Sequence, residues 1–148
     1  MNSTTSIPAT LVPDLATKPI TRHVATAARI LLGLVFFVFG LNGFFNFIPP
    51  PPTPMPDRAM AFIGGLMGSG YMLALIGGTQ VVVGALLLAN RFVALALILI
   101  APVIVNIVAF HVFLERSGLT IALVVLGLES YLLWTRRAAY RGLLAPRS

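Results

Sequence analysis

The chain has 148 residues, of which 58% are hydrophobic and only 9% are charged, and its mean hydropathy is +0.97. Soluble domains carry roughly 25% charged residues, and a soluble core of this size cannot hide so much apolar surface. The composition therefore excludes an ordinary soluble domain and favours a helical protein that crosses a membrane several times.

The amino-terminal segment differs from the rest of the chain. Residues 1–23 are rich in Thr and Pro and show no hydrophobic periodicity, so they are expected to form a flexible cytoplasmic tail. They do not resemble a signal peptide, because their basic residues come late and the apolar run that follows is long and lacks a small-residue cleavage site.

Four apolar runs follow this tail, and polar joints separate them. A helix needs about 20 residues to cross the hydrocarbon of a bilayer, within a range of about 17–25. The first three runs fit this range, and the fourth reaches the interface with help from the long side chains of Arg136 and Arg137. The runs comprise residues 25–47, 71–89, 92–113 and 119–135.

The lengths of the joints predict the fold. The last two joints have only two to five residues, so the helices that they connect must lie side by side and antiparallel. The sequence therefore predicts an all-α integral membrane protein, with an antiparallel four-helix transmembrane bundle over residues 24–136.

The first joint is longer and falls into two parts. The stretch "IPPPPTPMP" at 48–56 is rich in proline, so a helix cannot enter it. The stretch "DRAMAFIGGLMGSG" at 57–70 begins with Asp57, which favours a helix start, and ends with Gly68 and Gly70. It predicts a short helix that lies in the outer membrane interface.

Basic residues are sorted to one side of the four runs. Only Arg58 and Arg116 lie on the other side, each beside an acid. By the positive-inside rule both termini are expected in the cytoplasm, and residues 137–148 are expected to form a basic cytoplasmic tail. The sequence of this tail allows a short interfacial helix that ends near Pro146. The net charge of +6 then reflects topology or contact with anionic lipid, and it requires no nucleic acid. The sorted residues are Lys18, Arg22, Arg29, Arg91, Arg136, Arg137, Arg141 and Arg147.

A few polar side chains interrupt the apolar runs, and they are candidate ligand-binding residues. Polar groups inside a membrane are costly, so they usually face the interior of the helix bundle, where they often mark binding sites. By depth, Glu129 falls in the inner half of the bilayer, roughly 10 Å from Arg136 along its helix, and the others fall in the outer half or near the middle. Pro102 and Asn106 share one side of their helix and are expected to face the interior of the bundle. The candidates are Asn42, Asn46, Gln80, Asn106, His111 and Glu129.

Three stretches give the chain a resemblance to a known family. They are "ARILLGLVFFVFGLNGFF", "GGTQVVVGALLLANRFVALALILIAPVIVNIVAFHVF" and "LVVLGLESYLLWTRRAAYRGLL". With a glycine-rich second run, a central polar residue and an "NRF" turn, they resemble the DoxX family of small four-span bacterial membrane proteins. The resemblance implies a bundle in the bacterial inner membrane. It also implies a link to redox metabolism, since DoxD-type members are subunits of thiosulfate:quinone oxidoreductase.

The residue inventory excludes most covalent chemistry. The chain has no cysteine, which excludes disulfide exchange and iron–sulfur clusters. It has two histidines, and His23 precedes the first run, so one chain cannot supply two axial histidines to a haem inside the bundle. Glu129 is the single acid within the runs, which is too few for a hard metal ion. The chain is therefore expected to be non-catalytic and to hold no metal.

Three interpretations of the polar residues stay open. In the first, they form hydrogen bonds between the helices of an accessory or membrane-anchor subunit, which assembles with a redox partner protein. In the second, they line a site for a quinone or another lipid-soluble ligand. In the third, the chain is a small transporter or proton conductor that uses Glu129.

Several residues have structural alternatives too. His111 can bond water or a loop at the outer interface, and Glu129 can pair with Arg136. Gly33 with Gly40 on the first run, and the glycines spaced by seven on the second, form small-residue faces. These faces serve either packing within the chain or a homo-oligomer.

Overall fold

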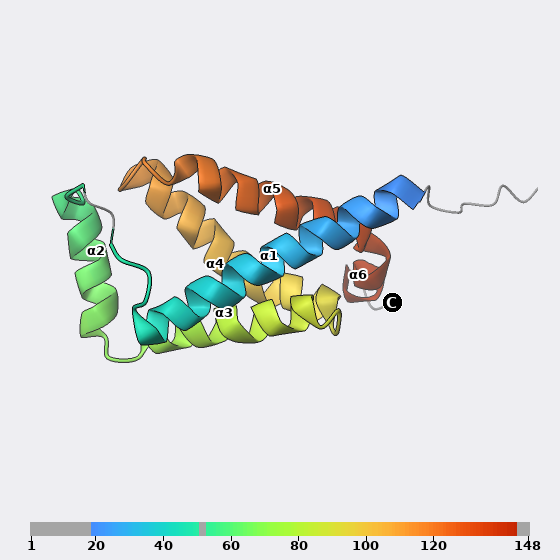
Figure 1. Cartoon of the computed structure of the whole chain (residues 1–148), viewed down its shortest axis with the longest axis horizontal. Coiled ribbons are helices and arrows are strands. Elements are labelled where there is room, and N and C mark those ends of the chain that lie inside the picture. Colours follow the sequence, from blue (N-terminus) through green and yellow to red (C-terminus); the bar gives the residue numbers. More distant parts are fainter. Residues whose placement is uncertain (1–18, 51–52, 145–148) are drawn as a thin grey trace, which may run out of the picture.

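The structure, a computed structural model, describes residues 19–50 and 53–144. Within these ranges it is all-helical and contains no strand, so the prediction of an all-α fold is confirmed. Six helices follow one another along the described chain (Figure 1): α1 Pro19–Phe45, α2 Asp57–Gly68, α3 Met72–Leu88, α4 Val93–Phe113, α5 Leu119–Thr135 and α6 Arg137–Leu144.

Two of these helices are long and apolar enough to cross a membrane alone. They are α4 and the part of α1 from Arg22 to Phe45. The pair of α2 and α3 meets the same criterion if it is taken as one span, although the two helices meet at 89°. Helix α5 is apolar and has 17 residues. By length and composition, the described chain thus has two or three helices able to cross a membrane.

The observed boundaries of α3, α4 and α5 agree with the predicted runs, whereas the predicted amino-terminal tail needs correction. Helix α1 already begins at Pro19, inside the tail expected over 1–23, because proline suits the first turn of a helix. The basic segment over 137–148 contains the short helix that its sequence allows, and this helix extends to Leu144. The Tyr140 hydroxyl docks it on α4 by donating to the carbonyl oxygen of Ala94 at 3.2 Å. Residues 1–18 and 145–148 lie outside the described residues.

Helices α1 and α3 make the most extensive helix–helix contact in the described chain. A β-carbon at Gly84 would lie 2.5 Å from the backbone nitrogen of Phe37, and one at Gly40 would lie 2.9 Å from the carbonyl oxygen of Gly77. Rising numbers on α1 therefore meet falling numbers on α3, so the two helices are antiparallel. Small residues allow this close approach of two backbones, so these glycines serve packing within the chain.

The remaining contacts close a ring of four helices. Helix α3 packs on α4, α4 on α5, and α5 on α1. A tight turn reverses the chain between α3 and α4, with left-handed backbone at Asn90 (φ 55°) and Phe92 (φ 50°). Buried apolar side chains from the four helices form one core. Its largest fully buried members are Leu32, Phe36, Val83, Leu87, Leu97, Ile100, Ile104 and Leu132.

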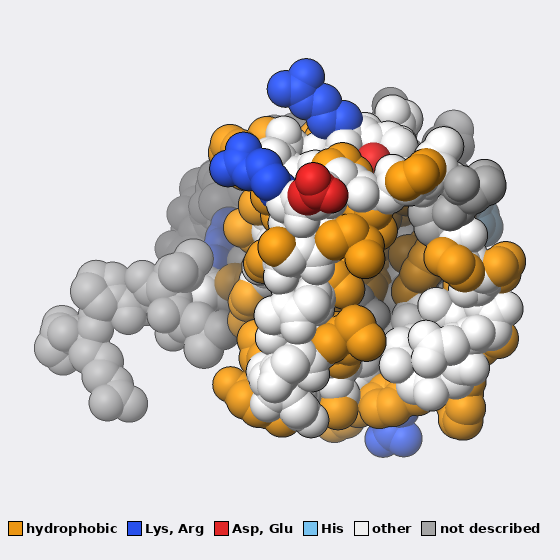
Figure 2. Space-filling view, turned by 90° about the vertical axis from the view of Figure 1, so that its left-hand side faces the viewer, with side chains coloured by type: hydrophobic (Ala, Val, Ile, Leu, Met, Phe, Trp, Pro, Cys, Tyr) orange, Lys and Arg blue, Asp and Glu red, His pale blue; other side chains and the backbone are white. Residues whose placement is uncertain are grey.

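The two ends of the molecule differ in charge and shape. Helix α2 lies at one end, and α6 lies at the other together with the start of α1 (Figure 1). The α2 end carries two arginines and two acids, and its hydrophobic side chains surround a hollow (Figure 2). The α6 end carries most of the described arginines, as the sorting of charges in the sequence predicts. They are Arg22, Arg29, Arg91, Arg136, Arg137 and Arg141.

Candidate functional site

Two adjacent cavities lie toward the α2 end of the molecule. The first, named here the α2 groove, has a volume of about 380 Å³ and lies between α2, α3 and α4, with Phe62 and Phe110 in its walls. The second, named the interhelical cavity, has a volume of about 520 Å³ and is walled by α1, α4 and α5, with Phe36 and Val125 among its residues. Both volumes fall in the range of about 300–1,000 Å³ that is usual for small-molecule sites. Three residues line both cavities: Gln80, Ile107 and His111.

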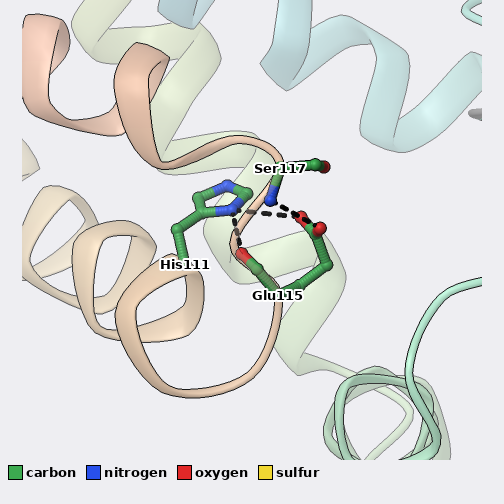
Figure 3. A network of polar contacts seen from close by, with 3 residues as sticks. All are labelled: His111, Glu115 and Ser117. Atoms are coloured by element: carbon green, nitrogen blue, oxygen red, sulfur yellow. Dashed lines mark hydrogen bonds and ion pairs between the residues drawn. The ribbon is translucent and has the colours of Figure 1, made fainter.

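His111 is the most firmly held polar side chain between the two cavities. It lies in the last turn of α4, and its Nδ1 donates to the backbone carbonyl oxygen of Glu115 at 2.9 Å (Figure 3). The same nitrogen lies 3.3 Å from the Glu115 carboxylate. Because a carbonyl oxygen can only accept a hydrogen bond, Nδ1 carries a proton. The other ring nitrogen, Nε2, has no hydrogen-bond partner in the described part of the chain.

The loop after His111 fixes the position of its ring. The carboxylate of Glu115 accepts a hydrogen bond from the backbone nitrogen of Ser117 at 2.8 Å. Hydrogen bonds from the side chain and backbone of Ser117 hold the pKa of Glu115 below its usual value of 4.5. Gly118 precedes α5 and lies directly against the imidazole, so that a β-carbon there would overlap the ring. The ring, the loop and the start of α5 are thus built as one unit.

Two amide side chains also reach this region. Gln80 is half-buried on α3 and lines both cavities, whereas Asn106 on α4 lines the α2 groove. Neither amide forms a hydrogen bond with a described residue. Asn106 and Pro102 are exposed, which corrects the expectation that they face the interior of the bundle. The reason is that Ile100 and Ile104 fill the interior side of α4, roughly 200° around the helix from Pro102 and Asn106 respectively.

Asn42 and Asn46 lie at the end of α1, outside the lining of the two cavities. The Asn42 side-chain oxygen accepts a hydrogen bond from the backbone nitrogen of Ile48 at 2.7 Å. Asn46 has a left-handed backbone (φ 49°), and its N–H donates to the carbonyl oxygen of Asn42 at 2.9 Å. Asparagine tolerates this conformation at the end of a helix. The pair ends α1, and neither residue lines the α2 groove or the interhelical cavity.

Glu129 lies apart from the other candidates, on the interior face of α5. Its side chain is only 3% exposed, and its Oε1 has no hydrogen-bond partner among the residues described. Pairing with Arg136, one of the alternatives that the sequence left open, is not formed, and Arg136 is exposed. Val125, one turn before Glu129, lines the interhelical cavity. The carboxyl group of Glu129 therefore lies one helical turn beyond this cavity, between the helices. Burying an ionised carboxylate without a partner costs several kcal/mol.

Two residues that the sequence did not single out for the site also matter. Arg29 is buried in α1, and its guanidinium donates to the carbonyl oxygens of Leu87 and Leu88 at the end of α3. A cation at the carboxyl end of a helix is favourable. In the sequence, Arg29 stands out only as one of the basic residues that are sorted to one side. Phe62 on α2 packs against Phe110 with ring centroids 5.7 Å apart and forms a wall of the α2 groove.

The chemistry of the two cavities is set by the groups that line them. The described residues contain no group of three or more His, Cys, Asp or Glu that could hold a metal ion. What the two cavities present is an apolar lining with one imidazole and two amides. A lining of this kind binds an apolar molecule and orients it through a few hydrogen bonds.

Comparisons with known proteins show a distant relative. No protein-family model matches the chain, and no solved structure matches it. The chain is similar to "Uncharacterized protein YwoB" of Bacillus subtilis (strain 168), with 24% identity over 131 residues that cover 85% of each protein. The likeness extends over nearly the whole of both chains and carries no information about an activity.

Proposed function

We propose that this chain is a DoxX-like, four-span protein of the bacterial inner membrane that binds a lipid-soluble ligand, such as a quinone, between its helices. In this proposal α1, α3, α4 and α5 cross the membrane, and α2 lies in the outer interface. The arginines at the α6 end support cytoplasmic termini. The closed ring of helix contacts supports a four-helix bundle. The protein acts as a non-catalytic accessory or anchor subunit for a redox partner.

The observation that carries the ligand-binding proposal is the position of His111 between two apolar cavities. A quinone has an apolar tail and a ring with polar oxygens, so it requires an apolar volume with hydrogen-bonding groups at one place. The α2 groove and the interhelical cavity supply the volume, and His111 and Gln80 are the polar residues shared by both. An imidazole held through Nδ1 has little freedom left to lose when a ligand binds to Nε2.

Thermal unfolding of the purified protein in lipid nanodiscs tests this proposal. A ubiquinone or menaquinone analogue is expected to raise the melting temperature, because a ligand that binds only the folded state stabilises it. Gln80→Leu is expected to remove the increase, because the Gln80 amide can donate a hydrogen bond to a quinone oxygen. Thr79→Val is the matched control, since Thr79 precedes Gln80 on α3 but lines neither of the two cavities. If no quinone changes the melting temperature of the parent protein, the proposed function is wrong.

The redox partner is tested by purification in a mild detergent from a bacterium that expresses the chain at its natural level. The accessory role is supported if a redox protein remains bound through the purification and if quinone reduction in the same preparation depends on that protein. A preparation that contains the chain alone contradicts it.

A second function, proton conduction or small-molecule transport, is favoured by one observation. Glu129 is buried between the helices, and its Oε1 has no hydrogen-bond partner among the described residues. Intramembrane carboxyl groups of this kind often carry protons. A pH gradient across liposomes that contain the protein would then decay faster than in empty liposomes, and Glu129→Gln would abolish the difference. Equal decay with the parent protein and the variant excludes this function.

A further inference from the structure

The hydrogen bond between His111 and the backbone of Glu115 determines which ring nitrogen is protonated. A backbone carbonyl oxygen has no proton to donate, so the 2.9 Å contact requires the hydrogen on Nδ1. In the neutral imidazole the second nitrogen, Nε2, is then a bare acceptor. No side-chain substitution at Glu115 removes this constraint, because the acceptor belongs to the main chain.

The surroundings of the ring keep this arrangement in place. Gly118 lies against the imidazole, so the ring has little room to turn over. A turned ring would also lose its bond to the carbonyl oxygen of Glu115. Figure 3 shows Nδ1 directed at Glu115, with the second ring nitrogen on the far side of the ring. His111 lines both the α2 groove and the interhelical cavity. Nε2 is therefore the atom that His111 offers to a ligand.

The other polar groups of the site do not discriminate between donors and acceptors. Gln80 and Asn106 each carry an amide, which donates through its NH₂ and accepts through its oxygen. Either amide can satisfy a carbonyl, an ether or a hydroxyl group of a ligand. Nε2 of His111, by contrast, can only accept. If it faces an acceptor atom of the ligand, no hydrogen bond forms and the two atoms repel each other. The choice between ligand types thus falls to His111 alone.

We propose that the site selects ligands that donate a hydrogen bond, so that phenols and hydroquinones with an apolar tail bind more tightly than the corresponding quinones and ethers. This inference rests on the proposed function, since it concerns the same cavities, and it names the class of ligand that they prefer. The hydroxyl group of the ligand donates to Nε2 of His111, and no covalent bond changes.

The experiment compares two molecules that differ at one position, where a methyl group replaces the hydroxyl hydrogen. They are para-dodecylphenol and its methyl ether, and their binding is measured to protein-loaded nanodiscs, with empty nanodiscs giving the partition into lipid. The measurement is made at about pH 8.5, above the range in which imidazoles usually take up a proton. The phenol is expected to bind about threefold to tenfold more tightly, the usual effect of one hydrogen bond.

Two variants assign the preference to His111. His111→Leu is expected to bind the phenol and the ether equally. Thr79→Val, which lies outside both cavities, is expected to keep the preference for the phenol. If phenol, ether and quinone bind the parent protein equally, the inference falls and the proposed function stands. If none of the three binds, both fall. A preference for the phenol that persists in His111→Leu also overturns the inference.

Nitrogen NMR of labelled histidine gives a test that does not depend on a ligand. The chain has only two histidines, so His23→Gln leaves the His111 ring as the one labelled group. At the same pH, its spectrum is expected to show a protonated Nδ1 and an unprotonated Nε2. The opposite tautomer would overturn the inference, because Nε2 would then be a donor.

Discussion

The backbones of Gly84 on α3 and Phe37 on α1 are in direct contact, since a β-carbon at Gly84 would lie 2.5 Å from the Phe37 nitrogen and 2.7 Å from its Cα. Both neighbouring atoms belong to the main chain, so they can give way only if the two helices move apart. We expect Gly84→Ala to lower the free energy of unfolding by about 1–3 kcal/mol, the usual cost of overpacking. Thermal or denaturant unfolding in a mild detergent measures the change.

The matched control for this substitution is in the same helix. A β-carbon at Gly78 would meet no heavy atom within 4 Å. Gly78→Ala is therefore expected to be neutral or to stabilise the protein by up to about 1 kcal/mol, because alanine favours a helix more than glycine does. Equal effects of the two substitutions would show that α1 and α3 do not pack as described.

The same type of substitution at Gly118 tests the anchoring of His111. The backbone of Gly118 (φ −87°) is accessible to any residue, so Gly118→Ala acts through the overlap of its β-carbon with the imidazole and not through backbone strain. We expect the bond between Nδ1 and the Glu115 carbonyl to break, and the His111 nitrogen spectrum to show a mixture of tautomers. Gly127→Ala, whose β-carbon would meet nothing within 4 Å, is expected to leave the spectrum unchanged.

The positions of the helices were predictable, while their orientation about their own axes was not. Long apolar runs separated by short joints defined α3, α4 and α5 almost to the residue. The orientation of α4 about its axis could not be predicted in the same way. Nearly all its residues are apolar, so no polar stripe marks its outer side. Only packing shows that Ile100 and Ile104 take the interior side and leave Asn106 to the α2 groove.

Prediction of the site was limited for a related reason. Gln80 and His111 were identified because a polar residue within an apolar run is unusual, and the structure places both at the boundary of the two cavities. The same criterion selected Asn42, which helps to end α1. A polar residue that ends a helix and one that lines a cavity look alike in sequence. They differ only in what the side chain meets, which depends on the path of the chain after the helix.

The acidity of Glu115 provides a prediction about pH. Its hydrogen bonds with Ser117 favour the carboxylate in the folded loop and hold its pKa below the usual value of 4.5. A group with a lowered pKa contributes stability above its unfolded pKa and loses that contribution as the pH falls through the folded value. We therefore expect the loop to be fully ordered at neutral pH and to loosen on acidification below 4.5. Exchange of the Ser117 amide hydrogen should accelerate there, after correction for the intrinsic rate.

Ser117→Ala serves to assign this effect. The variant removes the side-chain hydrogen bond to Glu115, so the pKa of that carboxyl group is expected to move back toward 4.5. An NMR titration of the Glu115 carboxyl carbon compares the two proteins. An identical midpoint in the parent protein and in Ser117→Ala would contradict the described network.

Glu129 provides the last prediction, and it separates a structural role of this carboxyl group from a functional one. A buried polar atom without a partner costs about 1–3 kcal/mol, and an apolar side chain of similar size avoids that cost. We expect Glu129→Leu to raise the free energy of unfolding by about this amount. Glu129→Gln keeps a buried polar group and is expected to bring no such gain. If the Leu variant is less stable than the parent, the carboxyl group has a stabilising partner. Glu129 is then not a buried acid without a hydrogen bond, as the structure has it. A residue that lowers stability is retained where function requires it. A more stable Glu129→Leu variant that also fails to dissipate a pH gradient would therefore favour proton conduction over the accessory role.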